Sequence, residues 1–337
     1  MRGTVWASTV DAADLAALDP GVPADLDRQP EVLVVGGGVI GLATAVFCRR
    51  AGISRVLVVE AARLAAAASG GAGGALAPGL HQLSDPPAFV TLARASLALY
   101  RQLDQDWDRA LGLEQTAGLL LLPQGPPPGL RPWPGVELLD HKQVAELVPE
   151  LVPMPAGLLA HDQARVHPLR LAAALARRAG SIATGVAMTD LEVDGGRIVR
   201  VRTTGGELHP GVVVFATGLA PEPWVQVPQR LVKGHLVATE PVSFRLVCGL
   251  HSPGLWGGVD GRWWAARRRH PRRGGLLPPG PPGGHPAHPA SAGRAAPSRR
   301  PGAGAPPVVL FPSGHGRRPA GDRPCARPRQ RLGERWP

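Results

Sequence analysis

Three glycines and one glutamate have the types and spacing of a nucleotide site. Gly36, Gly38 and Gly41 fit the pattern G-x-G-x-x-G, and Glu60 follows them. The first glycine permits a tight turn, the second lets the backbone approach a pyrophosphate, and the third allows a helix to pack closely on a strand. The acid can then accept hydrogen bonds from both ribose hydroxyls, and it would repel a 2′-phosphate.

The elements around these residues are the ones that this chemistry needs. Residues 32–35 form a continuous apolar run, typical of a parallel strand buried on both faces. A helix is predicted from Leu42 to about Arg50, and its N-terminus would offer free N–H groups to phosphates. A second strand over residues 55–59 ends in Glu60. This order predicts an adenine dinucleotide site, and the alternative is a fortuitous glycine turn.

A run of small residues after Glu60 bears on the kind of dinucleotide. Residues 65–79 are mostly alanine, glycine and serine, whereas a simple nicotinamide-binding fold would continue directly into its next helix and strand. We interpret this run as backbone that wraps around a large flat group such as an isoalloxazine ring; a flexible linker is the alternative. Further on, a hairpin is predicted over 191–201 and a buried strand over 212–215.

At this point the chain resembles a known family, the FAD-dependent amino-acid and amine oxidoreductases of the D-amino-acid oxidase superfamily, in the branch of glycine oxidase and sarcosine oxidase. The resemblance runs from about Glu31 to Arg262 and is carried by VLVVGGGVIGLATA, VLVVEAARLAAAASGGAGGALAPG, HDQARVHPLRLAAALARRAG, VVVFATG and VKGHLVATE. It implies an α/β fold: a Rossmann-type FAD-binding domain with a parallel sheet, and a substrate domain with an antiparallel sheet.

The resemblance also implies which residues contact FAD. The glycine turn would hold the pyrophosphate, Glu60 the adenosine ribose, and the backbone of Val186 the adenine, while the loop from Ser69 to Gly74 would lie along the flavin. The full set is Gly36, Gly38, Val39, Ile40, Gly41, Glu60, Ala61, Arg63, Ser69, Gly70, Gly73, Gly74, Val186, Ala216, Thr217 and Gly218.

The expected organisation is discontinuous. We expect a flexible N-terminal extension, an FAD-binding domain in two pieces, a substrate domain in two pieces, and a disordered tail rich in Arg, Pro and Gly. These comprise residues 1–29, residues 30–80 with 160–218, residues 81–159 with 219–262, and residues 263–337. Within the substrate domain, apolar residues at three- and four-residue intervals predict a helix over 88–111, with Phe89 and Leu92 on its buried face.

The activity implied by the resemblance is oxidation of the C–N bond of a small amino acid or secondary amine. A hydride would pass from Cα to flavin N5, and the resulting imine would be hydrolysed; oxygen, or a quinone or other electron carrier, would be the acceptor. No catalytic residue is assigned. His81 follows the flavin loop and could face the substrate, but a structural role is the alternative, as it is for Lys233 and His235.

Cysteine spacing, hydropathy and charge restrict the other classes of function. The three cysteines are far apart and match no metal or disulfide spacing, which suits the cytoplasm. No apolar run reaches the roughly 18 residues of a membrane span. The net charge of +11 comes from the tail: residues 263–337 hold 15 arginines and two acids, whereas the first 262 residues hold 22 basic and 24 acidic side chains. The part expected to fold therefore carries no basic surface for nucleic acid.

The tail begins abruptly at Trp263, and the genetic code suggests a reason. Tryptophan is encoded only by TGG, so the bases after Arg262 are partly known. Regrouped from the third base of the Arg262 codon, they permit Leu-Val-Gly-Gly-Thr, which resembles the strand that the family has here. We therefore infer a frameshift near Arg262, which would leave this chain impaired. The alternatives are an inactive fragment, or a dinucleotide-binding module with an RNA-binding tail.

Overall fold

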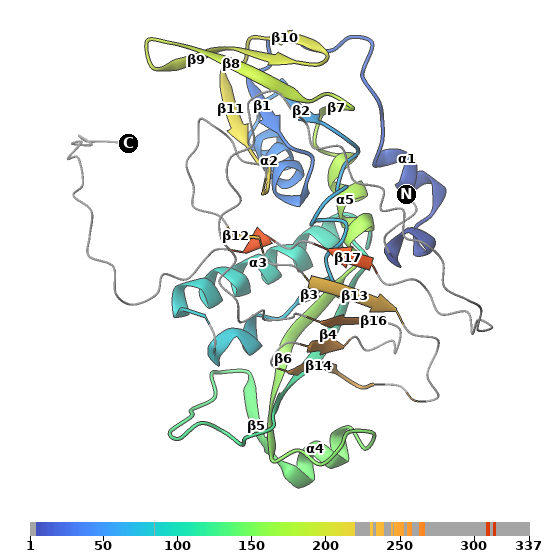
Figure 1. Ribbon diagram of the computed structural model, residues 1–337, viewed down its shortest axis with the longest axis vertical. Helices are drawn as coiled ribbons and strands as arrows, with labels where there is room; N and C mark the ends of the chain where they lie inside the picture. The colour runs from blue at the N-terminus through green and yellow to red at the C-terminus, as the bar shows by residue number, and fades with distance from the viewer. Residues whose placement is uncertain are drawn as a thin grey trace, which may run out of the picture.

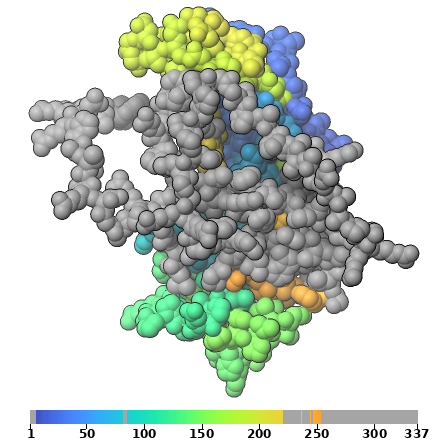
Figure 2. Space-filling model, viewed as in Figure 1, coloured from blue at the N-terminus to red at the C-terminus, as the bar shows by residue number. Residues whose placement is uncertain are grey.

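The computed structural model arranges the chain as an α/β layer and a large sheet that lie end to end (Figure 1). The space-filling view shows the same long shape (Figure 2). Residues 188–208 lie at one end of the molecule, and the β5–α4 region lies at the other. The structure describes residues 5–83, 85–219, 230–231, 234–238, 244, 246–252, 255–257, 263–266, 308–310 and 313–314.

The first layer is a four-stranded parallel sheet, as predicted. Its strands are β1 (Val32–Val35), β2 (Val56–Glu60), β7 (Ser181–Thr184) and β11 (Val212–Phe215), in the order β11-β1-β2-β7. The side chains of β1 and the first four residues of β2 are buried, because α2 (Val39–Arg50) and α5 (Pro168–Ala176) contribute to the apolar core on one face and a second sheet covers the other.

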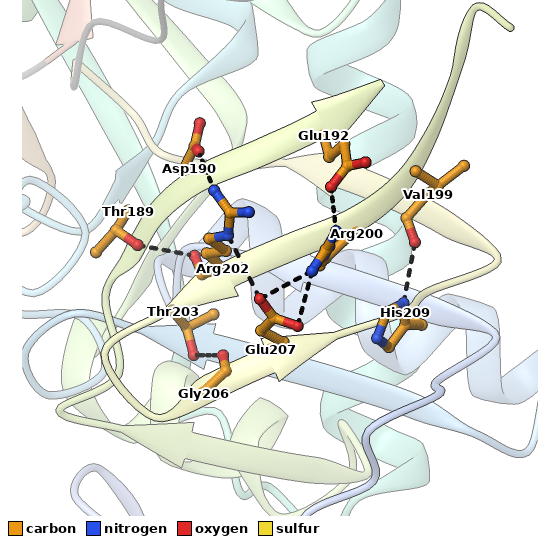
Figure 3. Close-up of polar contacts among 10 residues, drawn as sticks. All are labelled: Thr189, Asp190, Glu192, Val199, Arg200, Arg202, Thr203, Gly206, Glu207 and His209. Carbon is orange, nitrogen blue, oxygen red and sulfur yellow. Dashed lines mark hydrogen bonds and ion pairs between the residues drawn. The ribbon is translucent and has the colours of Figure 1, made fainter. Parts of the chain in front are cut away.

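That second sheet is the predicted hairpin with one more strand. It consists of β8 (Met188–Asp194), β9 (Arg197–Thr203) and β10 (Gly206–Leu208). The turn residues Gly195 and Gly196 have positive φ values of 54° and 77°, which confirms the glycine turn. One face packs apolar side chains on the parallel sheet, and the other carries a ladder of ion pairs from Arg200 and Arg202 to facing acids (Figure 3). These pairs are exposed and stabilise the fold little.

The substrate-domain sheet is largely antiparallel, as the resemblance implied. Its path is β17-β13-β16-β15-β14-β4-β6-β3, with β5 also paired to β6; β4 and β14 run parallel, and the other described pairs of this sheet are antiparallel. A separate pair joins β12 (Arg230–Leu231) to β18 (Ser313–Gly314). The strands of the large sheet are β3 (Ala75–Leu76), β4 (Leu113–Leu122), β5 (Val136–Asp140), β6 (Ala156–Val166), β13 (Gly234–Ala238), β14 (Gly249–Ser252), β15 (Leu255–Gly257), β16 (Trp263–Ala266) and β17 (Val308–Leu310).

Three helical segments accompany this sheet: η2 (Pro78–Leu83), α3 (Pro87–Asp106) and α4 (His141–Leu147). The predicted helix over 88–111 exists but ends earlier. Its expected buried face is wrong in the first turns, where Phe89 and Leu92 are 48% and 67% exposed while Val90 is buried. The buried line instead runs through Val90, Leu97 and Asp104, seven residues apart. Only the C-terminal part of α3 joins the main core, so apolar spacing near its start does not imply burial.

The N-terminal residues are a correction to the expected flexible extension. Residues 5–29 carry η1 (Val5–Thr9) and α1 (Ala12–Ala17), and they pack on the FAD-binding part. Trp6 and Leu18 are buried in the main core, and Asp14 forms an ion pair with Arg177, just after α5. Trp6 and Leu18 are isolated apolar residues in an acidic segment, so no apolar period predicted their burial.

The segment after Arg262 also departs from expectation where it is described. Trp263–Ala266 form β16, which pairs with β13 and β15, so the large sheet continues past the expected boundary at residue 262. β17 and β18 lie in the same segment. These three strands lie in the segment for which a tail disordered throughout was expected. The rest of 263–337 lies outside the described residues. Among the described residues, no helix has the length and apolar character needed to cross a membrane.

His167 links the N-terminal segment to the N-terminus of α5. Its Nδ1 accepts a hydrogen bond from the Arg170 N–H at 3.3 Å, and its Nε2 lies 2.9 Å from the Thr9 hydroxyl oxygen. That hydroxyl donates to the Trp6 carbonyl, so it accepts from a ring that carries its proton on Nε2. Burial, with Arg170 close by, lowers the pKa of His167 from its usual 6.5 to about 4.

We therefore expect acid to destabilise this chain through His167. Between pH 6.5 and 4 the unfolded state binds more protons than the folded state, so the free energy of unfolding falls as the pH falls through this window. His167→Asn keeps a side-chain acceptor for capping but does not titrate. Its melting temperature should change less between pH 7 and pH 4.5 than that of the parent chain. Equal slopes for the two chains would contradict the assignment.

Candidate cofactor-binding site

The glycine turn brings three backbone segments too close together for side chains. Gly36 ends β1 with a φ of +111°, and a Cβ there would lie 2.5 Å from the Ala216 carbonyl oxygen. A Cβ on Gly41 would lie 2.0 Å from the Gly36 carbonyl oxygen. The close contact at Gly36 brings the ends of β1 and β11 together, and the close contact at Gly41 places α2 against the turn. The structure therefore places the backbone of Ala216 and Thr217 beside the turn. Contact of Ala216, Thr217 and Gly218 with FAD stays a prediction.

The N-terminus of α2 faces the loop predicted to lie along the flavin. Gly38 caps the helix without a side chain, and the Val39 N–H donates to the Ser69 hydroxyl oxygen at 3.0 Å. A Cβ on Gly38 would lie 3.1 Å from that oxygen. Ile40 belongs to the same first turn, and its side chain is 69% exposed. The Ser69 hydroxyl thus accepts one of the N–H groups at the helix N-terminus, the kind of donor that a pyrophosphate would also use.

Gly37 is a site residue that the motif does not single out. A Cβ there would lie 2.4 Å from the Leu64 side chain, and its N–H donates to Glu60 Oε2 at 2.7 Å. The pattern G-x-G-x-x-G allows any residue at this position. The need for glycine here is recognised only from the structure, in which the Leu64 side chain packs against the turn.

Glu60 lies at the end of β2, at the level of the glycine turn. Its Oε2 accepts the hydrogen bond from the Gly37 N–H, and its Oε1 accepts one from the Ala62 N–H at 2.9 Å. A carboxylate oxygen accepts two hydrogen bonds, so both oxygens keep capacity for ribose hydroxyls. Val186 is buried, and its N–H donates to the Glu60 carbonyl at 2.9 Å. Val186 therefore lies beside Glu60 with its own N–H already engaged, and its contact with adenine stays a prediction.

Arg63 carries an unsatisfied donor near this acid. Its Nη1 is buried and has no hydrogen-bond partner, while Ala61, two residues earlier, is exposed. A buried guanidinium nitrogen without an acceptor costs free energy, and that cost is removed when an anionic or polar ligand supplies one. Arg63 was predicted to contact FAD, and this donor fits that role.

The small-residue run forms a tightly bound loop between the two domains. A Cβ on Gly70 would lie 2.1 Å from the Ala65 carbonyl oxygen, and one on Gly74 would lie 2.3 Å from that of Val166. Gly74 also accepts a hydrogen bond from the Val166 N–H at 2.9 Å, and β3 follows and pairs with β6. These contacts make the glycines structurally necessary and count against the flexible-linker alternative. Gly73 lies inside the same loop.

The substrate side of the site is described less fully. The backbone of His81 lies in η2 and that of His235 in β13, but their side chains, like Lys233, lie outside the described residues. Sequence reasoning did not consider Arg165 on β6. This arginine is the register partner of Ala75, directly after the flavin loop, and it forms an ion pair of 2.7 Å with Glu114. No sequence signal separated it from the other arginines.

Comparison with known proteins agrees with this geometry. The family described as FAD dependent oxidoreductase matches residues 31–285, which is most of the chain. The chain therefore belongs to this family. The match extends past residue 262, where the sequence resemblance was expected to stop, and so takes in β16.

Individual relatives are more distant. The chain is 28% identical over 240 residues to the bifunctional protein ThiO/ThiG of Synechocystis, covering 68% of this chain and 35% of that protein. It is 28% identical over 226 residues to glycine oxidase of Pseudomonas putida, covering 61% of each. The L-amino acid deaminase structure from Proteus myxofaciens, in complex with anthranilate, superposes with a TM-score of 0.63 at 20% identity, over 73% of this chain and 60% of that one. That identity shows a shared fold only.

FAD is the cofactor of this family, and the residues present fit it. At the glycine turn the backbone packs more closely than a Cβ would permit, the α2 N-terminus and Arg63 Nη1 offer donors, and Glu60 offers acceptors. The chain spans about a third of the first relative and three-fifths of the second, so the fit concerns the cofactor half of the site.

Two alanine substitutions should separate the folding role of the turn from its binding role. Gly41→Ala places a Cβ against backbone and should destabilise the cofactor-free chain by about 1–3 kcal/mol, the usual cost of overpacking. Gly38→Ala meets only a hydroxyl that can rotate, so the fold should tolerate it while FAD affinity falls. Denaturant unfolding and flavin fluorescence titration measure the two effects. Equal loss of stability in both variants would show this separation to be wrong.

Proposed function

We propose that this chain derives from an enzyme that oxidises the C–N bond of a small amino acid or secondary amine. The observation that carries the proposal is the cofactor cradle of Gly36, Gly41 and Glu60, joined through the flavin loop to a mostly antiparallel sheet. Membership of the FAD-dependent family gives the redox class. Relatives named glycine oxidase and L-amino acid deaminase support an amino-acid substrate.

The chemistry is divided between the cofactor and the protein. When bound, FAD accepts the hydride that leaves the substrate carbon next to nitrogen. The protein supplies position and charge: the α2 N-terminus and Arg63 neutralise the pyrophosphate, and Glu60 fixes the ribose. The flavin loop sets the distance between this anchor and the large sheet. Oxygen, or a quinone or other carrier, takes the electrons, and the reducing cytoplasm is the proposed compartment.

Arg165 is the described residue best placed to serve the substrate side. Its side chain is 13% exposed, and it borders the flavin loop through the pairing of Ala75 with β6. A guanidinium in this position would attract the carboxylate of an amino acid, although Glu114 already neutralises part of its charge. We assign it to substrate attraction and orientation and to no step of bond breaking.

We further propose that a frameshift near Arg262 impairs this particular chain. Two exposed apolar surfaces support this. On β11, which lies at one edge of the described parallel sheet, Val212 is 56% exposed. On α2, the side chains of Ile40 and Phe47 are 69% and 38% exposed. Parallel sheets are normally covered on both faces and along their length, so these surfaces are those that a further strand and helix would cover.

The test compares two proteins. The printed chain keeps its present reading frame, and the shifted chain is made from the same gene with the reading frame moved by one base from the Arg262 codon. The shifted chain should purify yellow, and glycine or sarcosine should bleach its flavin absorbance without oxygen. The printed chain should retain little flavin and show no bleaching. Lactate, which has no C–N bond, is the matched control and should leave the shifted chain yellow.

Each part of the proposal can fail separately. Bleaching of the printed chain by an amino acid would contradict the proposal that this chain is impaired. A shifted chain that binds FAD but responds only to lactate would remove the substrate class. Salt-sensitive RNA binding by the printed chain, lost on deletion of residues 263–337, would favour the alternative of a binding module with a basic tail.

A further inference from the structure

We propose that residues 5–21 act as a clasp that positions the flavin loop and the segment after Glu60 before the cofactor binds. This inference rests on the proposed function only in naming FAD as the ligand that benefits. The clasp touches the cofactor site at three places, all of them through hydrogen bonds to backbone or to a strand end. No residue of the clasp belongs to the glycine motif or to the family match, which begins at residue 31.

The first contact holds the flavin loop itself. Trp6 is buried at 4% exposure, and its indole Nε1 donates to the Ala72 carbonyl oxygen at 2.8 Å. Ala72 lies between Gly70 and Gly74, the two glycines at which the loop passes close to other backbone. A small-residue loop loses much conformational entropy on ordering, so an external donor near its centre lowers that cost at the time of binding.

The second contact holds the residue beneath the glycine turn. The Leu64 N–H donates to the Leu18 carbonyl oxygen at 2.9 Å, and both side chains are fully buried. Leu64 is the side chain that fills the space beside Gly37, and it directly follows Arg63. Leu18 therefore fixes the backbone next to Arg63, whose Nη1 is buried without a hydrogen-bond partner.

The third contact lies at the ribose end of the site. The Thr184 N–H donates to the Gly21 carbonyl at 3.0 Å, and the Thr184 hydroxyl donates to Asp19 Oδ1 at 2.8 Å and accepts from the Gly21 N–H at 2.9 Å. Thr184 ends β7 and is the register partner of Glu60. The clasp thus reaches from the flavin loop to the strand end beside the ribose-binding acid.

The clasp is itself anchored on α5, which makes it a positioning element and not a loose cover. Asp14 is 7% exposed and pairs with Arg177 at 2.7 Å, and Asp11 caps α1 by accepting from the Asp14 N–H at 2.7 Å. Trp6 also meets the His167 ring edge-on, with centroids 4.8 Å apart. Because α5 packs in the main core, movement of the clasp requires movement of the core.

The decisive variant is Trp6→Phe in the full chain. Phenylalanine keeps an aromatic ring in the core but removes the donor to Ala72, a loss of about 1 kcal/mol or about fivefold in an equilibrium. In the cofactor-free chain we expect amide hydrogen exchange in residues 65–76 to become about fivefold faster. FAD affinity, measured by quenching of flavin fluorescence, should fall by a similar factor.

The matched control is Leu208→Ala on β10, fully buried on the opposite face of the parallel sheet. It should lower the free energy of unfolding more than Trp6→Phe does, while exchange in residues 65–76 stays as in the parent. Unchanged loop exchange in Trp6→Phe, or equal acceleration in Leu208→Ala, would overturn the proposal. The FAD titration is made in the shifted chain defined under Proposed function, with and without Trp6→Phe. If that chain binds no FAD, the proposed function fails, but the exchange comparison in the printed chain still decides the clasp.

Discussion

Backbone contact at the glycine turn is the constraint on which the rest of this structure depends. At Gly36 and Gly41 a side-chain carbon would overlap a carbonyl oxygen, so β1, α2 and the end of β11 meet at a separation that only glycine permits. This closeness creates the donor-rich helix end and places Glu60 within reach of the same turn. The flavin loop has the same kind of close backbone contact at Gly70 and Gly74, where it joins the two domains. Cofactor geometry is thereby fixed by backbone packing, with few polar side chains involved.

The sequence predicted best where one physical requirement selects one residue type. The apolar runs at 32–35 and 212–215 became parallel strands, buried at 32–35 but only partly buried at 212–215, and the double-glycine turn near 195 closed a hairpin. The glycine turn was predicted for the same reason, because close backbone approach selects glycine; the ribose contact of Glu60 stays a prediction. Burial on both faces leaves an unbroken apolar run, a signal that needs no knowledge of partners.

Prediction was weaker where packing partners decide the outcome. Phe89 and Leu92 have helical spacing but face solvent, because only the later turns of α3 meet the core. Trp6 and Leu18 are isolated apolar residues in an acidic segment, and no period reveals that both anchor it in the main core. Arg165 is one arginine among many until the pairing of β3 with β6 sets it beside the flavin loop. Each of these depends on contacts between residues far apart in the chain.

The position of β11 has a consequence for handling the protein. A strand at the margin of a sheet presents unpaired N–H and C=O groups to any other extended chain, and proteins usually protect such margins with charge, proline or a covering segment. Among the described strands β11 pairs with β1 alone, Val212, Val213 and Val214 carry neither charge nor proline, and the neighbouring helix exposes Ile40 and Phe47 to solvent. Concentrated samples should therefore self-associate through this side of the molecule, and the yield of monomer will depend on keeping the chain dilute or on adding arginine or mild detergent.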